Sequence, residues 1–384
     1  MEVSTLFHTE RDGWSAALPF ELDSERTLVL AFAGSALFDR PEPIEELARA
    51  FPNSHLLGCS TSGEILGTRV RDDSLTVAVA RLQQTRLATA FAVSKSAEDS
   101  GEAAAAVAAQ LADPSLRGLF VLSHGQKVNG TNLVRGLNSA LPSGVVVTGG
   151  LAGDGDRFRR TWVIHEGRPR PELVGAVGFY GERVRIGHGS KGGWDIFGPE
   201  RLVTRSRGNI LYELDGKPAL ELYKAYLGER ASELPAAALL FPLALRDRRE
   251  ESPQVVRTVL AVDEEAQSLT FAGDVPEGQL AQLMKANFDR LIDGASRAAE
   301  MSRLAQGDPP TMAVAISCVG RRLVLGERTE EELEHTLDIL PAETHQVGFY
   351  SYGEISPYTH GQVGDNPCEL HNQTMTLTTI AEAA

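Results

Sequence analysis

The chain has 384 residues and a formal net charge of −15. Its length exceeds the usual size of one domain, so two domains are expected. The excess of acidic residues disfavours sequence-independent binding of nucleic acid and docking on an anionic membrane, because both need a basic surface. We therefore expect neither a nucleic-acid partner nor a membrane partner.

The N-terminal segment and the cysteines indicate a cytoplasmic location. Residues 1–12 lack the basic start and the apolar run of a secretory signal peptide. The three cysteines (Cys59, Cys318 and Cys368) show no metal-ligand spacing, and their odd number fits a reducing compartment.

Three stretches of the chain share one pattern of strand, helix and second strand. In the first, an apolar strand at 28–33, a helix at 43–51 and a strand at 55–59 predict a β-α-β unit with parallel strands. Each second strand runs into small residues and then into a glycine followed by an acid. These pairs are Gly63 and Glu64, Gly153 and Asp154, and Gly353 and Glu354. The predicted fold class is α/β, with two halves of mixed sheets built from β-α-β units and helices packed on the sheets.

Two β-hairpins are predicted between these units. The strands 75–82 and 87–93 are separated by a short polar turn, which is typical of a hairpin. The strands 255–262 and 268–271 flank an acidic turn in the same way.

Three helices and one irregular segment are predicted in the second half, and the first of these helices begins at Lys217 and Pro218 and runs to Leu227. Apolar residues at helical spacing predict the longest helix over 276–305. Thr329 and Glu332 have the spacing of a capping box at the start of another helix. The glycine-rich residues 189–194 are expected to be irregular, because glycines weaken regular elements.

Four stretches of the chain together resemble the FIST domain. They are GCSTSGE at 58–64, GGLAGD at 149–154, VTRSRGNILYELDGKPA at 203–219 and GFYSYGEI at 348–355. The resemblance covers nearly the whole chain and implies an N-terminal domain at 1–182 and a C-terminal domain at 183–384. It further implies a sensory module of bacterial signal transduction that binds a small ligand. The implied partner is a separate signalling protein, such as a histidine kinase or a cyclic-dinucleotide enzyme.

The three acids are candidates for a ligand site. In open α/β sheets ligands bind at the carboxyl ends of strands, so Glu64, Asp154 and Glu354 could line one pocket. Their carboxylates would suit the ammonium group of an amino acid or an amine. The alternative is ordinary turn chemistry, in which each acid accepts hydrogen bonds from nearby backbone N–H groups.

Neighbouring residues complete this predicted ligand site. Strand alternation sends Tyr350 and Tyr352 to one face, where both rings could wall a ligand. The other predicted site members are the small residues around the acids, namely Cys59, Ser60, Gly63, Gly153 and Gly353.

Two rival functions remain open on the sequence. Cys59 could be the nucleophile of an acyl-transfer or hydrolytic enzyme, although no histidine stands in a recognisable partner motif. Some members of the resembled family bind haem and sense nitric oxide. His188, between glycines and near Trp194, is the candidate axial ligand for a haem b. We expect a sensor that is not an enzyme, with its cofactor unknown.

Overall fold

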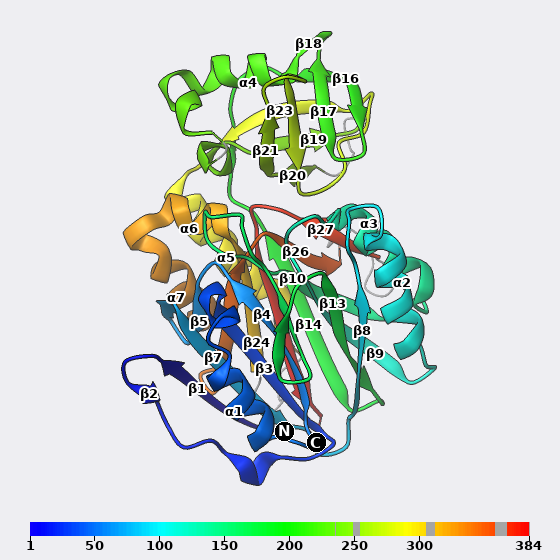
Figure 1. Ribbon diagram of the computed structural model, residues 1–384, viewed down its shortest axis with the longest axis vertical. Coiled ribbons are helices and arrows are strands. Elements are labelled where there is room, and N and C mark those ends of the chain that lie inside the picture. Colours follow the sequence, from blue (N-terminus) through cyan, green and yellow to red (C-terminus); the bar gives the residue numbers. More distant parts are fainter. Residues whose placement is uncertain (235, 249–253, 305–311, 358–366, 384) are drawn as a thin grey trace.

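The computed structural model describes residues 1–234, 236–248, 254–304, 312–357 and 367–383. Three sheets form the body of the molecule, and a further sheet belongs to a segment inserted between two strands of the third sheet (Figure 1). In this view the insertion lies above the body, with α4 at its edge, and both chain termini lie together at the lower end of the body.

The three body sheets have the same strand order. The first sheet runs β12 (Arg168–Arg170), β11 (Val163–His165), β4 (His55–Thr61), β3 (Thr27–Gly34), β7 (Ser74–Arg81), β1 (Glu2–Thr9) and β2 (Gly13–Trp14). The second runs β27 (Cys368–His371), β26 (Gly353–Pro357), β10 (Val146–Leu151), β9 (Leu116–Ser123), β13 (Leu173–Tyr180) and β8 (Arg86–Val93). The third runs β6 (Arg69–Arg71), β5 (Glu64–Leu66), β25 (His345–Ser351), β24 (Met312–Cys318), β28 (Met375–Glu382) and β14 (Val184–Lys191).

At the centre of each sheet lies the parallel pair that the sequence predicts. These pairs are β3 with β4, β9 with β10, and β24 with β25. The chain then leaves its own sheet and adds an antiparallel two-stranded segment to a neighbour, so that β5 pairs β25, β11 pairs β4 and β26 pairs β10. The three units therefore exchange segments in a closed ring, which ties distant parts of the chain together.

The inner faces of all three sheets share one hydrophobic core. Phe32, Phe120 and Phe349, one from each sheet, belong to this cluster and are almost fully buried. Helices cover the outer faces: α1 (Glu42–Ala50) packs on the first sheet, α2 (Ser100–Leu111) and α3 (Gly130–Ala140) on the second, and α5 (Phe288–Ser302) and α7 (Thr329–Ile339) on the third. The short helix α6 (Val319–Leu325) follows β24. None of the described helices is long and apolar enough to cross a membrane.

The inserted segment has its own sheet and core. Its described strands are β20 (Val255–Arg257), β19 (Leu243–Arg246), β23 (Leu280–Lys285), β16 (Arg201–Arg207), β17 (Ile210–Leu214), β22 (Ser268–Phe271), β21 (Val259–Asp263), β15 (Asp195–Ile196) and β18 (Lys217–Pro218). The helix α4 (Ala219–Leu227) packs on this sheet. The predicted hairpin of 255–262 with 268–271 is confirmed by the antiparallel pairing of β21 and β22. The division of the chain between residues 182 and 183 stays a prediction.

The other predicted hairpin is wrong. β7 pairs with β1 and β3 in the first sheet, whereas β8 pairs with β13 in the second. The polar turn between them crosses from one sheet to the other. Its N–H groups at Gln83, Gln84 and Thr85 donate to the carboxylate of Glu382 at distances of 2.6, 2.8 and 2.7 Å, which fixes the crossing.

Three further predictions are corrected. The helix predicted over 276–305 begins only at Phe288, because Asn287 caps it by accepting from the backbone N–H of Arg290, and β23 precedes it. The capping box is also wrong, since Thr329 lies inside α7 and Glu332 is fully buried in an ion pair. The strand β14 extends to Lys191, so only 192–194 of the predicted irregular segment is irregular.

Candidate functional site

The three glycine–acid segments meet through backbone hydrogen bonds. The N–H of Gly153 donates to Ser60 O at 3.0 Å, that of Tyr350 to Gly63 O at 2.9 Å, and that of Tyr352 to Leu151 O at 3.2 Å. Each segment therefore contacts a neighbouring unit exactly where the two units exchange strands. The fold brings the three main chains together, although their carboxylates point to different partners.

Two of the glycines are needed for this close approach. Gly63 has φ of +132°, and a Cβ atom there would lie 2.6 Å from Nη1 of Arg322. A Cβ atom at Gly153 would lie 2.2 Å from Oγ of Ser62. A side chain at Gly63 would be strained by this φ and would displace the guanidinium of Arg322, and a side chain at Gly153 would displace the side chain of Ser62.

Glu64 and Glu354 have matching surroundings in two different units. Glu64 accepts hydrogen bonds from the hydroxyl of Thr61, three residues earlier, and from the N–H and hydroxyl of Ser74 at 2.9 and 2.8 Å. Glu354 accepts from the hydroxyl of Ser351, three residues earlier, at 2.5 Å. The N–H and hydroxyl of Thr374 donate to Glu354 at 3.2 and 2.9 Å. The first and third units therefore resemble each other in the side-chain contacts of these acids as well as in their main-chain fold.

Burial raises the carboxyl pKa of both Glu64 and Glu354. Desolvation raises the pKa of the Glu64 carboxyl to about 7 and that of Glu354 to about 8, and the hydrogen bonds they accept oppose the shift. Both side chains are almost fully buried. A substantial share of each group therefore holds its proton near neutral pH.

Asp154 fills the corresponding position in the second unit with a different set of donors. Its carboxylate accepts from the backbone N–H groups of Arg159 and Arg160, each at 2.8 Å, and from the hydroxyl of Tyr352. The ring of Tyr352 also stacks on Phe158 with centroids 4.7 Å apart. Asp154 thus closes the loop that follows it and joins that loop to the third unit.

A cavity of about 660 Å³ opens beside the first strand end, and we call it the strand-end cavity. Its size is that of a typical small-molecule site. All three units contribute to it. The described lining includes Thr61 to Glu64 from the first unit, Gly155 to Arg157 from the second, and Arg322 and Leu323 of α6 from the third. Neither Asp154 nor Glu354 is among these lining residues.

The charges around the strand-end cavity fall into paired and unpaired groups. Arg322 forms an ion pair with Asp72 at 2.6 Å and also donates to the carbonyl of Ser62 at 2.6 Å. Arg157 donates one hydrogen bond, to Ser35 at 3.0 Å, and makes no ion pair with any described residue, although together with the hydrogen bonds and charge of Arg322 its charge lowers the pKa of the Asp72 carboxyl. Asp156, next to it, has neither a hydrogen bond nor an ion pair from its side chain within the described chain. One loop thus offers an available anion and an available cation.

The other predicted site residues lie behind this cavity. Cys59 is fully buried in the shared core, and burial raises its thiol pKa well above the ordinary value. The hydroxyl of Ser60 accepts from the N–H of Trp162 at 3.1 Å. Tyr350 donates its hydroxyl to Glu332 at 2.7 Å, and Gly353 pairs with Leu151.

His188 lies on β14, opposite Thr378 of β28. The glycines on either side of it receive the outer helix: Cβ atoms at Gly187 and Gly189 would lie 2.0 Å from Ser302 O and 2.1 Å from Ala298 O. These glycines therefore admit the backbone of α5 and not the edge of a macrocycle. His188 does not line the strand-end cavity or any of four other cavities of the described chain. A haem therefore does not fit on the side of β14 that α5 covers.

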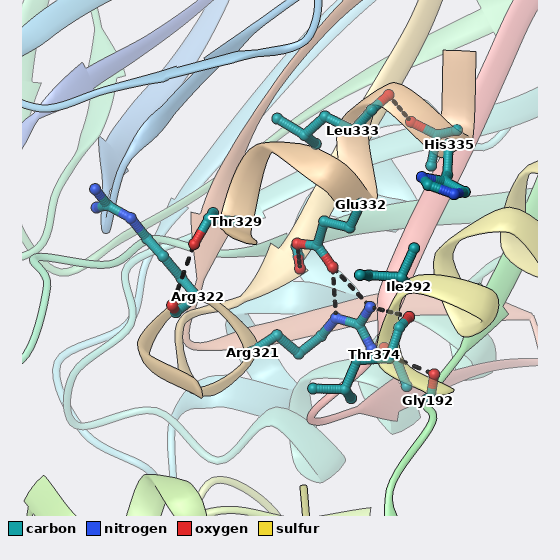
Figure 2. A network of polar contacts seen from close by, with 12 residues as sticks. Gly192, Ile292, Arg321, Arg322, Thr329, Glu332, Leu333, His335 and Thr374 are labelled. Atoms are coloured by element: carbon teal, nitrogen blue, oxygen red, sulfur yellow. Dashed lines mark hydrogen bonds and ion pairs between the residues drawn. The ribbon is translucent and has the colours of Figure 1, made fainter. Parts of the chain in front are cut away.

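A buried ion pair behind α6 was not predicted from the sequence. Arg321 and Glu332 are both fully buried and lie 2.7 Å apart (Figure 2). Arg321 also donates to the carbonyl oxygens of Leu291 at 2.8 Å and Gly192 at 3.2 Å. Arg321 thereby connects α6, α7, α5 and the end of β14. The pairing could not be read from the sequence, because Glu332 has the spacing of a capping residue.

Family models match almost all of the chain. The FIST N domain matches residues 27–217, and the FIST C domain matches residues 219–357. The chain belongs to the FIST family. FIST domains are sensory domains that bind small ligands in signalling.

Two single proteins also show similarity. The uncharacterized protein MJ1623 of Methanocaldococcus jannaschii is 26% identical over 239 residues, which are 55% of this chain and 45% of that protein. The chain thus spans about half the length of this curated relative. A solved structure of cyanuric acid hydrolase from A. caulinodans aligns with 100% of this chain and 99% of its own, at 10% identity and a TM-score of 0.36.

Proposed function

We propose that this FIST protein senses a small zwitterionic molecule, an amino acid or a related amine, in the strand-end cavity. The observation that carries the proposal is the pair of neighbouring side chains Asp156 and Arg157. Both line the cavity, and neither forms an ion pair within the described chain. An amino acid carries one charge of each sign, so its carboxylate could bind the guanidinium and its ammonium group the carboxylate.

Each lining group receives a role in this proposal. Arg157 holds the carboxylate of the ligand, because a guanidinium matches a carboxylate with two parallel hydrogen bonds. Asp156 holds the ammonium group, and Asp73 is a further exposed carboxylate of the lining. Gly63 and Glu64 form the floor. The remaining predicted site residues support the strand ends from behind, namely Cys59, Ser60, Gly153, Asp154, Tyr350, Tyr352, Gly353 and Glu354.

Ligand binding would be signalled to a partner protein by a change in how the three units are arranged. Since all three line the strand-end cavity, a ligand that contacts them together favours the arrangement in which they are closest. The surface that changes would be recognised by a separate signalling protein, such as a histidine kinase or a cyclic-dinucleotide enzyme.

The two rival functions receive less support. A nucleophilic Cys59 needs access and a lowered pKa, and its burial provides neither. Haem sensing through His188 needs a cavity beside the imidazole, and His188 lines none of the five cavities considered in the described chain.

The test begins with a thermal-shift screen of amino acids and amines on the full chain. The dissociation constant of the best ligand is then measured for Arg157→Gln, Asp156→Asn and the control Arg159→Gln. Arg159 lies on the same loop but does not line the cavity. We expect the first two variants to bind about tenfold more weakly, since each loses a charge-assisted hydrogen bond. The proposal fails if Arg157→Gln binds like the wild type, or if no amino acid or amine stabilises the chain.

A further inference from the structure

A glycine loop joins the body to the inserted segment. It consists of residues 191–194, from the last residue of β14 to the residue before β15, and its sequence is Lys-Gly-Gly-Trp. A cavity of about 160 Å³ lies on the side of this loop that faces α5, and another of about 210 Å³ lies on the side of β27 and the inserted segment. All four loop residues line both cavities, so the loop is accessible from two sides.

Positive charge gathers around the glycine loop in a chain whose net charge is −15. The described lining of the two cavities contains Lys191, Arg290 and Arg297, against one acid, Asp293. Arg290 is paired with Asp195. Lys191 and Arg297 make no ion pair and no side-chain hydrogen bond within the described chain. Two cations therefore remain available to a bound anion.

The main chain of the loop supplies donors as well. The carbonyl of Gly192 is held by buried Arg321 at 3.2 Å, as Figure 2 shows. Because a trans peptide is planar, the N–H of Gly193 must point the opposite way, away from Arg321. No acceptor for the N–H of Gly192 or Gly193 is found in the described chain. The carbonyl of Gly192 faces Gly294 of α5, so the N–H of Gly193 points away from α5, to the side of the loop opposite Arg297.

The glycines at this place also have a packing role. Gly193 has φ of +145°, and a Cβ atom there would lie 2.2 Å from Arg290 O. A Cβ atom at Gly294 would lie 1.7 Å from Gly192 O. This packing explains why the loop lies against α5, but it explains neither the two cavities nor the two unpaired cations.

We propose that the glycine loop is a second binding site, which takes a small oxyanion, a phosphate or a carboxylate group. Lys191 and Arg297 provide the charge in the cavity on the α5 side of the loop, which both side chains line. Oxyanions are commonly held by basic side chains through charge-assisted hydrogen bonds. This site shares no lining residue with the strand-end cavity, and it stands whether or not the proposed function holds.

Isothermal titration of the full chain with inorganic phosphate and, separately, with succinate tests the site. The variants are Lys191→Gln and Arg297→Gln, with Arg303→Gln as the control. Arg303 is exposed just beyond the C-terminus of α5 and lines neither cavity. Lys191 and Arg297 make no side-chain contacts that the fold needs, so the variants should unfold at the same urea concentration as the wild type.

We expect saturable binding that weakens about tenfold in Lys191→Gln and in Arg297→Gln and changes by less than about twofold in Arg303→Gln. Added chloride should also weaken it, since salt screens exposed charges. Tighter binding of phosphate would show that the site prefers a phosphate group. Tighter binding of succinate would show that it prefers a carboxylate group. The proposal is overturned if neither anion binds saturably at millimolar concentration, or if Lys191→Gln and Arg303→Gln bind equally well.

Discussion

The buried ion pair of Arg321 and Glu332 should be the most sensitive electrostatic contact of the body. Glu332 accepts hydrogen bonds from Ser317 at 2.9 Å, from Tyr350 at 2.7 Å and from Arg321 at 3.1 and 2.7 Å. In Glu332→Gln the guanidinium stays buried without its counter-charge, and the new NH₂ group faces other donors. Removing one partner of a buried pair costs about 3–5 kcal/mol, so we expect a loss of that size in the free energy of unfolding.

Urea unfolding followed by far-UV circular dichroism measures this loss. The matched control is Glu331→Gln, because Glu331 forms a partly exposed ion pair with Arg328 on the same helix, and a much smaller change is expected there. The double variant Arg321→Met, Glu332→Gln should lose less than the sum of its two single variants, since either substitution alone already breaks the pair. A loss in Glu332→Gln no larger than in Glu331→Gln would refute the reasoning.

Two further predictions concern buried titratable groups. Between about pH 4.5 and pH 8 the folded chain holds a proton on Glu354 that the unfolded chain has lost, so this group's contribution to stability falls as the pH rises. Glu354→Gln should therefore gain stability relative to the wild type over that range, by at most about 1.4 kcal/mol per pH unit in urea unfolding, and a difference that does not vary with pH would contradict the assignment. The thiol of Cys59 should react with a thiol reagent only after unfolding, because it is fully buried; rapid labelling of the native chain at Cys59, located by mass spectrometry, would contradict its placement in the core.

Much of the repeated fold could be predicted from the sequence. The parallel pairs and the glycine–acid segments show in it because apolar strands, turn residues and helical periodicity are local signals. The exchange of strands between units is not local. Nothing in the residues of β7 and β8 tells which sheet each joins, and their short polar turn is typical of a hairpin. The sheet that each strand joins is determined by contacts between distant parts of the chain, such as the hydrogen bond from the N–H of Gln83 to Glu382.

The candidate site was predicted in part. Gly63 and Glu64 line the strand-end cavity, and the three strand ends meet, but the carboxylates of Asp154 and Glu354 are not in its lining. Asp156 and Arg157 were missed because exposed charged residues in a loop carry no pattern of their own. Their importance follows from the absence of ion-pair partners among the described residues, which only a three-dimensional arrangement shows.

One measurement tests the zwitterion claim most directly. The amino acid that stabilises the chain best is titrated calorimetrically into the wild type, together with its N-acetyl derivative and its C-terminal amide. The account predicts that both derivatives bind about tenfold more weakly or not at all, because each has lost one of the two charges that Asp156 and Arg157 recognise. Binding of either derivative with the affinity of the parent amino acid would contradict it.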